Sequence, residues 1–192
     1  MTRKTAFIFS LLTMMMLVVL PSITAAQDDE SQLVCDAFTD SSDDVRTGYY
    51  MGEGAGFLNA GQYLRAIDSF SCIIEQIDAD YVDAYTNRAI AHFTRRNYDA
   101  ALEDYTSALE LRSSFAAAYN NRGIVYAALE EYESAIADFD QAIASSSNAA
   151  FIYNNRAVVH TIVGNFDAAI ADLEEAISIS GVDDTYATII ET

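Results

Sequence analysis

Lysine and cysteine are scarce in this chain, and several catalytic and ligand-binding motifs are absent. The one lysine is Lys4, so the clustered cations that bind nucleic acid are lacking. The two cysteines, Cys35 and Cys72, form neither a CxxC pair nor a zinc-ligand spacing. No Gly-rich phosphate loop or pair of catalytic carboxylates stands out, and His92 and His160 each lack a second metal ligand one helical turn away. We therefore expect no enzyme, cofactor or bound metal.

The N-terminus has the layout of a secretory signal peptide. Cationic Arg3 and Lys4 precede an apolar run over residues 6–20, and small residues end the segment at Ala26. The run is shorter than the roughly 20 residues that cross a bilayer as a helix. We predict cleavage of residues 1–26 before Gln27 and a secreted, periplasmic or cell-surface location. An uncleaved N-terminal membrane anchor is the alternative.

Cleavage would leave a strongly acidic chain. Without Arg3 and Lys4, 8 cationic residues remain against 29 acidic ones, a net charge of −21. Such a surface repels nucleic acid and anionic lipid, and it favours cationic partners or a salty medium. A merely soluble exported protein would have the same composition. Residues 27–46 carry three acidic clusters and few apolar residues, and we interpret them as an acidic N-terminal arm.

The cysteines lie on either side of the arm's end, 37 residues apart at Cys35 and Cys72. Disulfides persist in exported proteins, and a bridge here would tie the arm to the first helical pair. Closing a loop of this length would add about 3 to 4 kcal/mol of stability. Two free thiols are the alternative, because two cysteines fit either case.

One phrase recurs along the chain at a fixed period. YTNRA begins at Tyr85, YNNRG at Tyr119 and YNNRA at Tyr153, and a weaker copy begins at Tyr50, so the starts are 35, 34 and 34 residues apart. Such a period is typical of a solenoid. Each unit holds two apolar stripes of helical spacing, which predict a helix hairpin. Small residues recur at matching sites opposite aromatic ones, which predicts close packing of the two helices.

The repeats resemble the tetratricopeptide repeat family. The matching elements are the opening Tyr, the Asn-x-Gly/Ala pair and the Ala-Ile/Leu-x-x-Phe/Tyr-x-x-Ala-Ile/Leu second helix. The resemblance implies an all-α fold, a right-handed α-α superhelix of about four hairpins over residues 47–181, with repeats at 47–81, 82–115, 116–149 and 150–181. The family's usual final proline is absent, so capping residues or glycine must make those turns. Residues 182–192 keep an apolar stripe and predict a short C-terminal capping helix.

An arginine recurs in three repeats, 16 residues before an aspartate of the second helix. The first repeat has Glu53 and Ser69 at these positions, so both partners are lost together. This joint loss predicts structural ion pairs, with ligand contact as the alternative. The predicted pairs are Arg88 with Asp104, Arg122 with Asp138, and Arg156 with Asp172.

The family resemblance implies that the first helices line a concave groove. The implied lining is apolar with amides, and it lacks the Lys/Arg clamp that some family members use on a peptide's terminal carboxylate. Its residues are Met51, Leu58, Asn59, Thr86, Ile90, Phe93, Asn120, Ile124, Phe151, Asn154, Val158 and Ile162.

We predict that this groove binds a peptide or helix of another protein by burying apolar surface, with Asn120 and Asn154 bonding its backbone. A lining that only supports the superhelix is the alternative. The expected function is an exported scaffold for protein interactions. The alternative function is a structural protein that self-associates through the ends of its solenoid.

Overall fold

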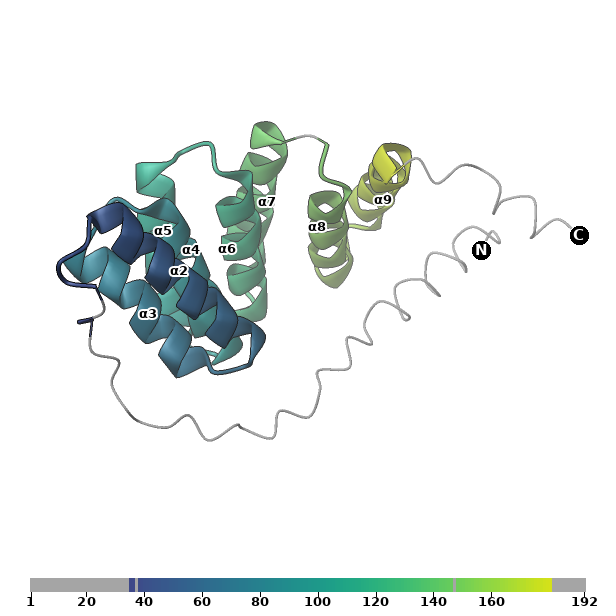
Figure 1. The fold of residues 1–192 in the computed structure, drawn as a ribbon. Coiled ribbons are helices and arrows are strands. Elements are labelled where there is room, and N and C mark those ends of the chain that lie inside the picture. The colour runs from purple at the N-terminus through teal and green to yellow at the C-terminus, as the bar shows by residue number, and fades with distance from the viewer. Residues whose placement is uncertain (1–34, 37, 147, 181–192) are drawn as a thin grey trace, which may run out of the picture.

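A computed structural model of the chain describes residues 35, 36, 38–146 and 148–180. These residues form eight helices and no strand, and consecutive helices pair as hairpins that stack in chain order (Figure 1). The predicted all-α helical-repeat solenoid is therefore confirmed. The helices are α2 (Asp43–Asn59), α3 (Tyr63–Gln76), α4 (Val82–Thr94), α5 (Tyr98–Leu111), α6 (Ala116–Ala128), α7 (Tyr132–Ser145), α8 (Ala150–Ile162) and α9 (Phe166–Ser180).

The hairpins can be placed beside the predicted repeat bounds. Helices α4, α6 and α8 begin at residues 82, 116 and 150, where the second to fourth repeats were expected to begin. Helix α2 begins at Asp43, before the expected start at Thr47. The predicted signal peptide, residues 27–34 of the arm and the predicted capping segment lie outside the described residues. No helix of the described part is long and apolar enough to cross a membrane.

Each hairpin turns through a residue in the left-handed backbone region at the same repeat position. These residues are Gly61, Arg96, Glu130 and Gly164, with φ between 63° and 81°. The next backbone N–H then donates to a carbonyl five residues earlier, as from Asn97 to His92 at 2.9 Å. Glycine adopts this conformation freely, whereas for a residue with a side chain the conformation is strained by about 1 to 2 kcal/mol.

Within a hairpin, a small residue of the first helix lies against an aromatic ring of the second. A Cβ atom added at Gly54 would lie 2.5 Å from Cε1 of Phe70, and one added at Gly123 would lie 2.9 Å from Cε1 of Phe139. Both rings are buried. Glycine therefore lets the ring touch the backbone, which is the close packing that the alternating sizes predicted.

Between hairpins, each second helix packs on the first helix of the next one, α3 on α4, α5 on α6 and α7 on α8. Each junction forms one buried apolar cluster to which both helices contribute. The first helices contribute the same two repeat positions each time, and both are buried. These residues are Ala84 and Ala91, Ala118 and Val125, and Ile152 and Val159.

Candidate functional site

Each recurring arginine makes a bidentate ion pair with the aspartate 16 residues later. In the third hairpin, Nε and Nη2 of Arg122 donate to the two carboxylate oxygens of Asp138 at 2.8 and 2.9 Å. The same geometry joins Arg88 to Asp104 and Arg156 to Asp172. All three aspartates are buried. Each guanidinium therefore compensates a carboxylate that has lost its water.

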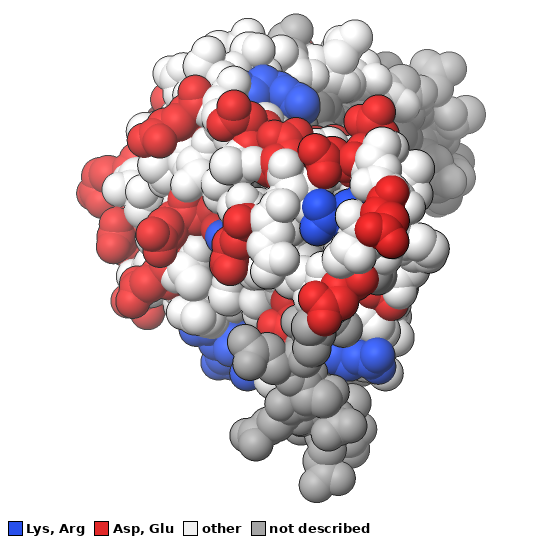
Figure 2. Space-filling view, turned by 60° about the vertical axis from the view of Figure 1, so that its left-hand side comes forward, with Lys and Arg blue, Asp and Glu red and all other residues white. Residues whose placement is uncertain are grey.

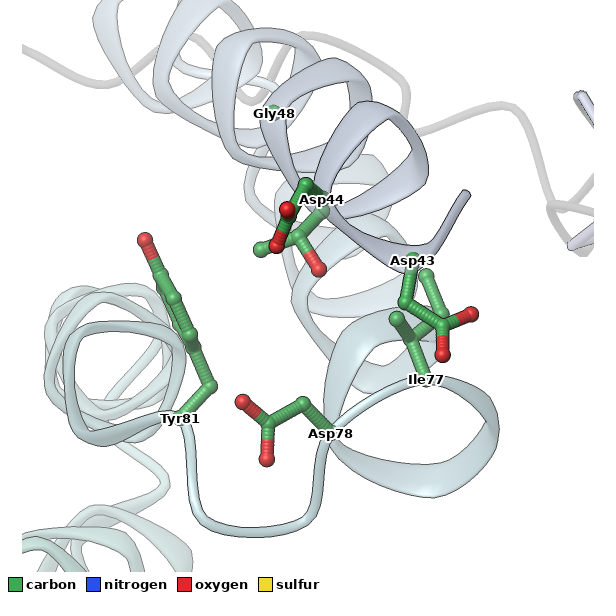
Figure 3. Close-up of a pocket in the computed structure, with 7 residues that line it drawn as sticks. Asp43, Asp44, Gly48, Ile77, Asp78 and Tyr81 are labelled. Carbon is green, nitrogen blue, oxygen red and sulfur yellow. The ribbon is translucent and has the colours of Figure 1, made fainter. Parts of the chain in front are cut away.

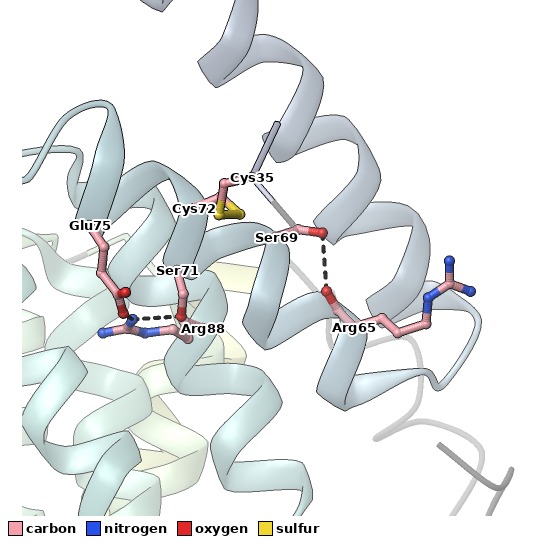
Figure 4. Close-up of a disulfide and its surroundings, with 7 residues drawn as sticks. All are labelled: Cys35, Arg65, Ser69, Ser71, Cys72, Glu75 and Arg88. Carbon is pink, nitrogen blue, oxygen red and sulfur yellow. Dashed lines mark hydrogen bonds and ion pairs between the residues drawn. A yellow bond between two sulfur atoms is a disulfide. The ribbon is translucent and has the colours of Figure 1, made fainter. Parts of the chain in front are cut away.

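The remaining guanidinium nitrogen of each arginine reaches back to the preceding hairpin. Nη1 of Arg88 donates to Oγ of Ser71 at 2.9 Å, and the Glu75 carboxylate lies beside the same nitrogen at 3.7 Å (Figure 4). The equivalent partners are Thr106 for Arg122, at 3.0 Å, and Asp140 for Arg156. Ser71, Thr106 and Asp140 occupy one repeat position, and this recurrence of polar residues was the signal that sequence reasoning missed.

Each arginine, with its aspartate and its partner in the preceding hairpin, is termed an arginine clasp. The guanidinium of each clasp stays protonated. Hydrogen bonding to Asp138 and to Asp172 raises the pKa of Arg122 and Arg156, while burial opposes it. Burial lowers the pKa of Arg88, but the hydrogen bonds and charge of Asp104 outweigh it, so the pKa is raised. Because each of the three nitrogens already has a protein partner, the geometry favours the structural role over ligand contact.

His92 lies beside the first of these clasps, that of Arg88 in the second hairpin. Its Nε2 atom is 4.0 Å from the Asp104 carboxylate, and burial lowers the pKa of the imidazole despite that charge. Together with Glu75, Arg88 and Glu103 it lines an outer cavity of about 430 Å³ between α3 and α5. Within the described part of the chain, no group of three or more His, Cys, Asp or Glu residues could hold a metal ion.

The predicted groove residues differ widely in their exposure. Ile90 on α4 and Phe151, Val158 and Ile162 on α8 are exposed, and Phe151 is the most open at 56%. Thr86 is buried, and its hydroxyl donates to the Val82 carbonyl of its own helix. Asn59 is exposed, and the half-buried members are Met51, Leu58, Phe93, Ile124 and Asn154.

The structure contradicts the prediction that the Asn120 amide bonds the backbone of a bound peptide. Its side chain is only 4% exposed, its Oδ1 accepts a hydrogen bond from Nδ2 of Asn155 at 2.8 Å, and its Nδ2 donates to Asn121. Both polar atoms are therefore used inside the fold, in a bond that joins α6 to α8. The Asn120 amide is unavailable to a peptide backbone, so apolar side chains dominate the accessible part of the lining.

The structure joins Cys35 to Cys72 by a disulfide (Figure 4). Cys72 is buried on α3, so the bridge anchors the described end of the arm to the first hairpin. Of the two alternatives left by the sequence, the structure contains the bridge.

An acidic cavity of about 350 Å³ lies close to this anchored end, where α2 begins (Figure 3). Asp43 and Asp44 line it from α2, and Asp78 and Tyr81 line it from the loop between α3 and α4. Figure 2 shows that acidic side chains are scattered over this side of the molecule, with few cationic ones between them. The electrostatic potential there favours cations over anions.

Solved structures share this architecture. MamA is 21% identical, with 70% of this chain and 78% of that chain covered and a TM-score of 0.66. PilF of Pseudomonas aeruginosa is 22% identical, with 74% and 65% covered and a TM-score of 0.67. The first TPR of Spaghetti (RPAP3), bound to the HSP90 peptide SRMEEVD, is 24% identical, with 62% and 93% covered and a TM-score of 0.59. At these identities the likeness concerns the fold alone.

Sequence comparison addresses the family directly. No curated protein matches the chain in sequence. Two family models do match, both described as tetratricopeptide repeat, one over residues 86–150 and the other over residues 152–180. Together with the repeat period and the stacked hairpins, these matches show that the chain belongs to the tetratricopeptide repeat family.

Proposed function

We propose that the chain is an exported, non-catalytic scaffold that binds a peptide or helix of another protein on the face formed by its first helices. The observation that carries this proposal is the exposed apolar stripe of α8. Phe151, Val158 and Ile162 are spaced at i, i+7 and i+11, so they lie on one side of the helix, and each is more than 40% exposed. Exposed apolar surface of this kind is typical of an interaction site.

The stripe continues across the neighbouring first helices. Ile90, Ile124 and Val158 stand 34 residues apart at one repeat position, on α4, α6 and α8. Contacts join α2 to α4 and α6 to α8, so Ile124 and Val158 lie on helices that touch. With the stripe of α8 they form an apolar surface across the last two hairpins, which suits a segment that buries several apolar side chains in succession.

The charge of the chain favours a different peptide from the one in the RPAP3 structure. That peptide, SRMEEVD, carries three acidic residues. The lining residues of this groove include no lysine or arginine, and the chain after residue 26 has a net charge of −21. We infer an apolar segment flanked by cationic residues, whose attraction to the acidic surface weakens as salt is added.

Export is part of the proposal and rests on two features. The first is the cationic, apolar and small-residue layout of residues 1–26. The second is the Cys35–Cys72 disulfide, a bond that persists in oxidising compartments. Mass spectrometry of the protein released by its own cells should find an N-terminus near Gln27. A chain that keeps Met1 in the cell would contradict export.

A peptide-display library screened on the purified chain tests the groove. Selected peptides should be rich in apolar and cationic residues, and Phe151→Ser with Ile162→Ser should weaken their binding at least about tenfold, because both side chains are then lost to burial. Leu111→Ser on α5 is the control, since it removes an exposed apolar side chain that lies outside both the groove and the two end helices. Equal loss in both variants, or no selected peptide, would refute the proposal.

A further inference from the structure

The two ends of the solenoid expose the two halves of a junction that the chain builds three times inside itself. In each internal junction a second helix covers the first helix of the next hairpin. Among the described residues, no hairpin follows α9 and none precedes α2 (Figure 1). The surfaces that these two helices would use in such a junction can be identified from their internal equivalents.

The outgoing half lies on α9. Ile177 is 58% exposed, whereas its equivalents Ile74 and Leu109 are only 9% and 6% exposed and Ile143 is half-buried, because α4, α6 and α8 cover them. Phe166 is exposed too, although the tyrosines at its repeat position in the earlier hairpins are half-buried. Phe166, the half-buried Leu173 and Ile177 follow one another at i, i+7 and i+11, and these three residues are termed the C-terminal face.

The incoming half lies on α2. Tyr49 and Gly56 occupy the two positions that are buried in α4, α6 and α8, yet Tyr49 is 36% exposed and a Cβ atom added at Gly56 would meet nothing within 4 Å. Val45 and Gly52 are also exposed and complete a stripe at i, i+4, i+7 and i+11. These four residues are termed the N-terminal face.

The two faces differ in shape in a way that suits one to the other. The C-terminal face presents bulky side chains, whereas Gly52 and Gly56 leave the backbone of α2 bare. Glycine weakens the middle of a helix, and no neighbour within the described chain requires it at these two sites. A helix from outside could approach α2 closely at these two glycines. Inside the chain, α3 approaches α4 in the same way at Ala84 and Ala91.

We propose that a second copy of this chain docks head to tail, with the C-terminal face of one copy on the N-terminal face of the next. The contact would continue the interface already made by α3 with α4, α5 with α6 and α7 with α8. Because the two faces are different surfaces, each added copy leaves one of each kind free, and the assembly can grow into a filament or close into a ring. This contact uses no residue of the groove.

The charge of the chain sets how this association responds to salt. Asp43 and Asp44 lie in the first turn of α2, and Glu174 and Glu175 lie on α9, so the approaching ends carry charges of like sign. Salt screens that repulsion and leaves the apolar contact in place. Self-association should therefore strengthen as ionic strength rises, whereas association through opposite charges would weaken.

Sedimentation velocity over a range of protein and salt concentrations tests the junction. The full-length chain is compared with the chain beginning at Gln27. Association that depends on residues 1–26 is then recognised because the shorter form loses it. The shorter form should still associate in high salt. Ile177→Gln on α9 and Gly56→Gln on α2 should each weaken association at least about tenfold, without changing the net charge. Phe151→Ser in the groove should leave it unchanged.

Mixing the two variants decides the geometry. Ile177→Gln keeps an intact N-terminal face and Gly56→Gln keeps an intact C-terminal face, so the mixture should form a one-to-one dimer that grows no further. A contact between like faces is excluded if each variant alone is monomeric. The proposal is overturned if the wild-type chain stays monomeric to about 1 mM in high salt. It is also overturned if Ile177→Gln lowers the stability of that monomer, because the Ile177 side chain would then be buried within one chain.

Discussion

The arginine clasp of the third hairpin offers the sharpest test of how the repeats are held together. Replacing Arg122 by leucine removes two charge-assisted hydrogen bonds from Asp138 and one bond from Thr106. The Asp138 carboxylate, almost fully buried, would then have no cation beside it. Breaking a buried pair from one side costs about 3 to 5 kcal/mol. Because some water still reaches the arginine side chain, we expect about 3 kcal/mol.

The first hairpin supplies the matched partner for this variant. It has Ser69 where the third has Asp138, and the buried Ser69 hydroxyl donates to the Arg65 carbonyl one turn earlier at 3.0 Å. Asp138→Ser alone should cost about 2 kcal/mol, because it leaves Arg122 partly buried without its carboxylate. The double variant Arg122→Leu with Asp138→Ser leaves no uncompensated charge, so it should cost no more than about 2 kcal/mol instead of about 5.

Urea unfolding followed by circular dichroism measures the three free energies. In thermal unfolding, Arg122→Leu alone should lower the melting temperature by roughly 6 to 12 °C for a chain of this size. The double-mutant cycle then gives a coupling energy of about 3 kcal/mol. If Arg122→Leu unfolds like wild type, or if the two single losses simply add, the arginine is not a structural clasp and its role must be sought in a ligand.

Two further predictions concern the hairpin turns and the response to acid. Arg96→Gly should raise the free energy of unfolding by about 1 kcal/mol in urea titrations, because glycine relieves the left-handed strain, and an unchanged or lower value would contradict this. Burial lowers the pKa of His92 below its ordinary value of about 6.5. The stability that the neutral imidazole contributes to the fold is therefore full above about pH 6.5, and it is lost as the pH falls through the lowered pKa. His92→Tyr, the third hairpin's residue, should flatten the decline in stability between about pH 7 and 5, and equal slopes would contradict this.

The hairpins could be predicted because their cause is local and repeats in register. Gly123 and Phe139 each recur in kind in other copies, so the close approach of two helices was visible without coordinates. The start of α2 was placed too late for a local reason as well. Asp43 and Asp44 look like arm residues by their charge, yet acidic side chains stabilise the first turn of a helix through its macrodipole.

The candidate site was less predictable because it depends on distances between repeats. The helical period correctly puts Asn120 and Asn154 at equivalent positions, but the period says nothing of how near the next hairpin comes. Asn155 approaches within hydrogen-bond distance of Asn120 and buries it, while Asn154 stays half-buried. The reach of Arg122 to Thr106 escaped notice for the same reason, since it crosses from one hairpin to another.

The arginine clasps also shape how the surface behaves. Eight arginines follow residue 26. Three of them, Arg88, Arg122 and Arg156, have side chains at most 20% exposed, and buried carboxylates neutralise their charge. The surface is therefore acidic with few cations to offset it, and salt should act oppositely on the two proposed contacts. Added salt should weaken a cationic peptide in the groove and strengthen the end-to-end junction, because it screens attraction in one and repulsion in the other. Ionic strength would thus decide between a free scaffold that carries a peptide and an assembled one.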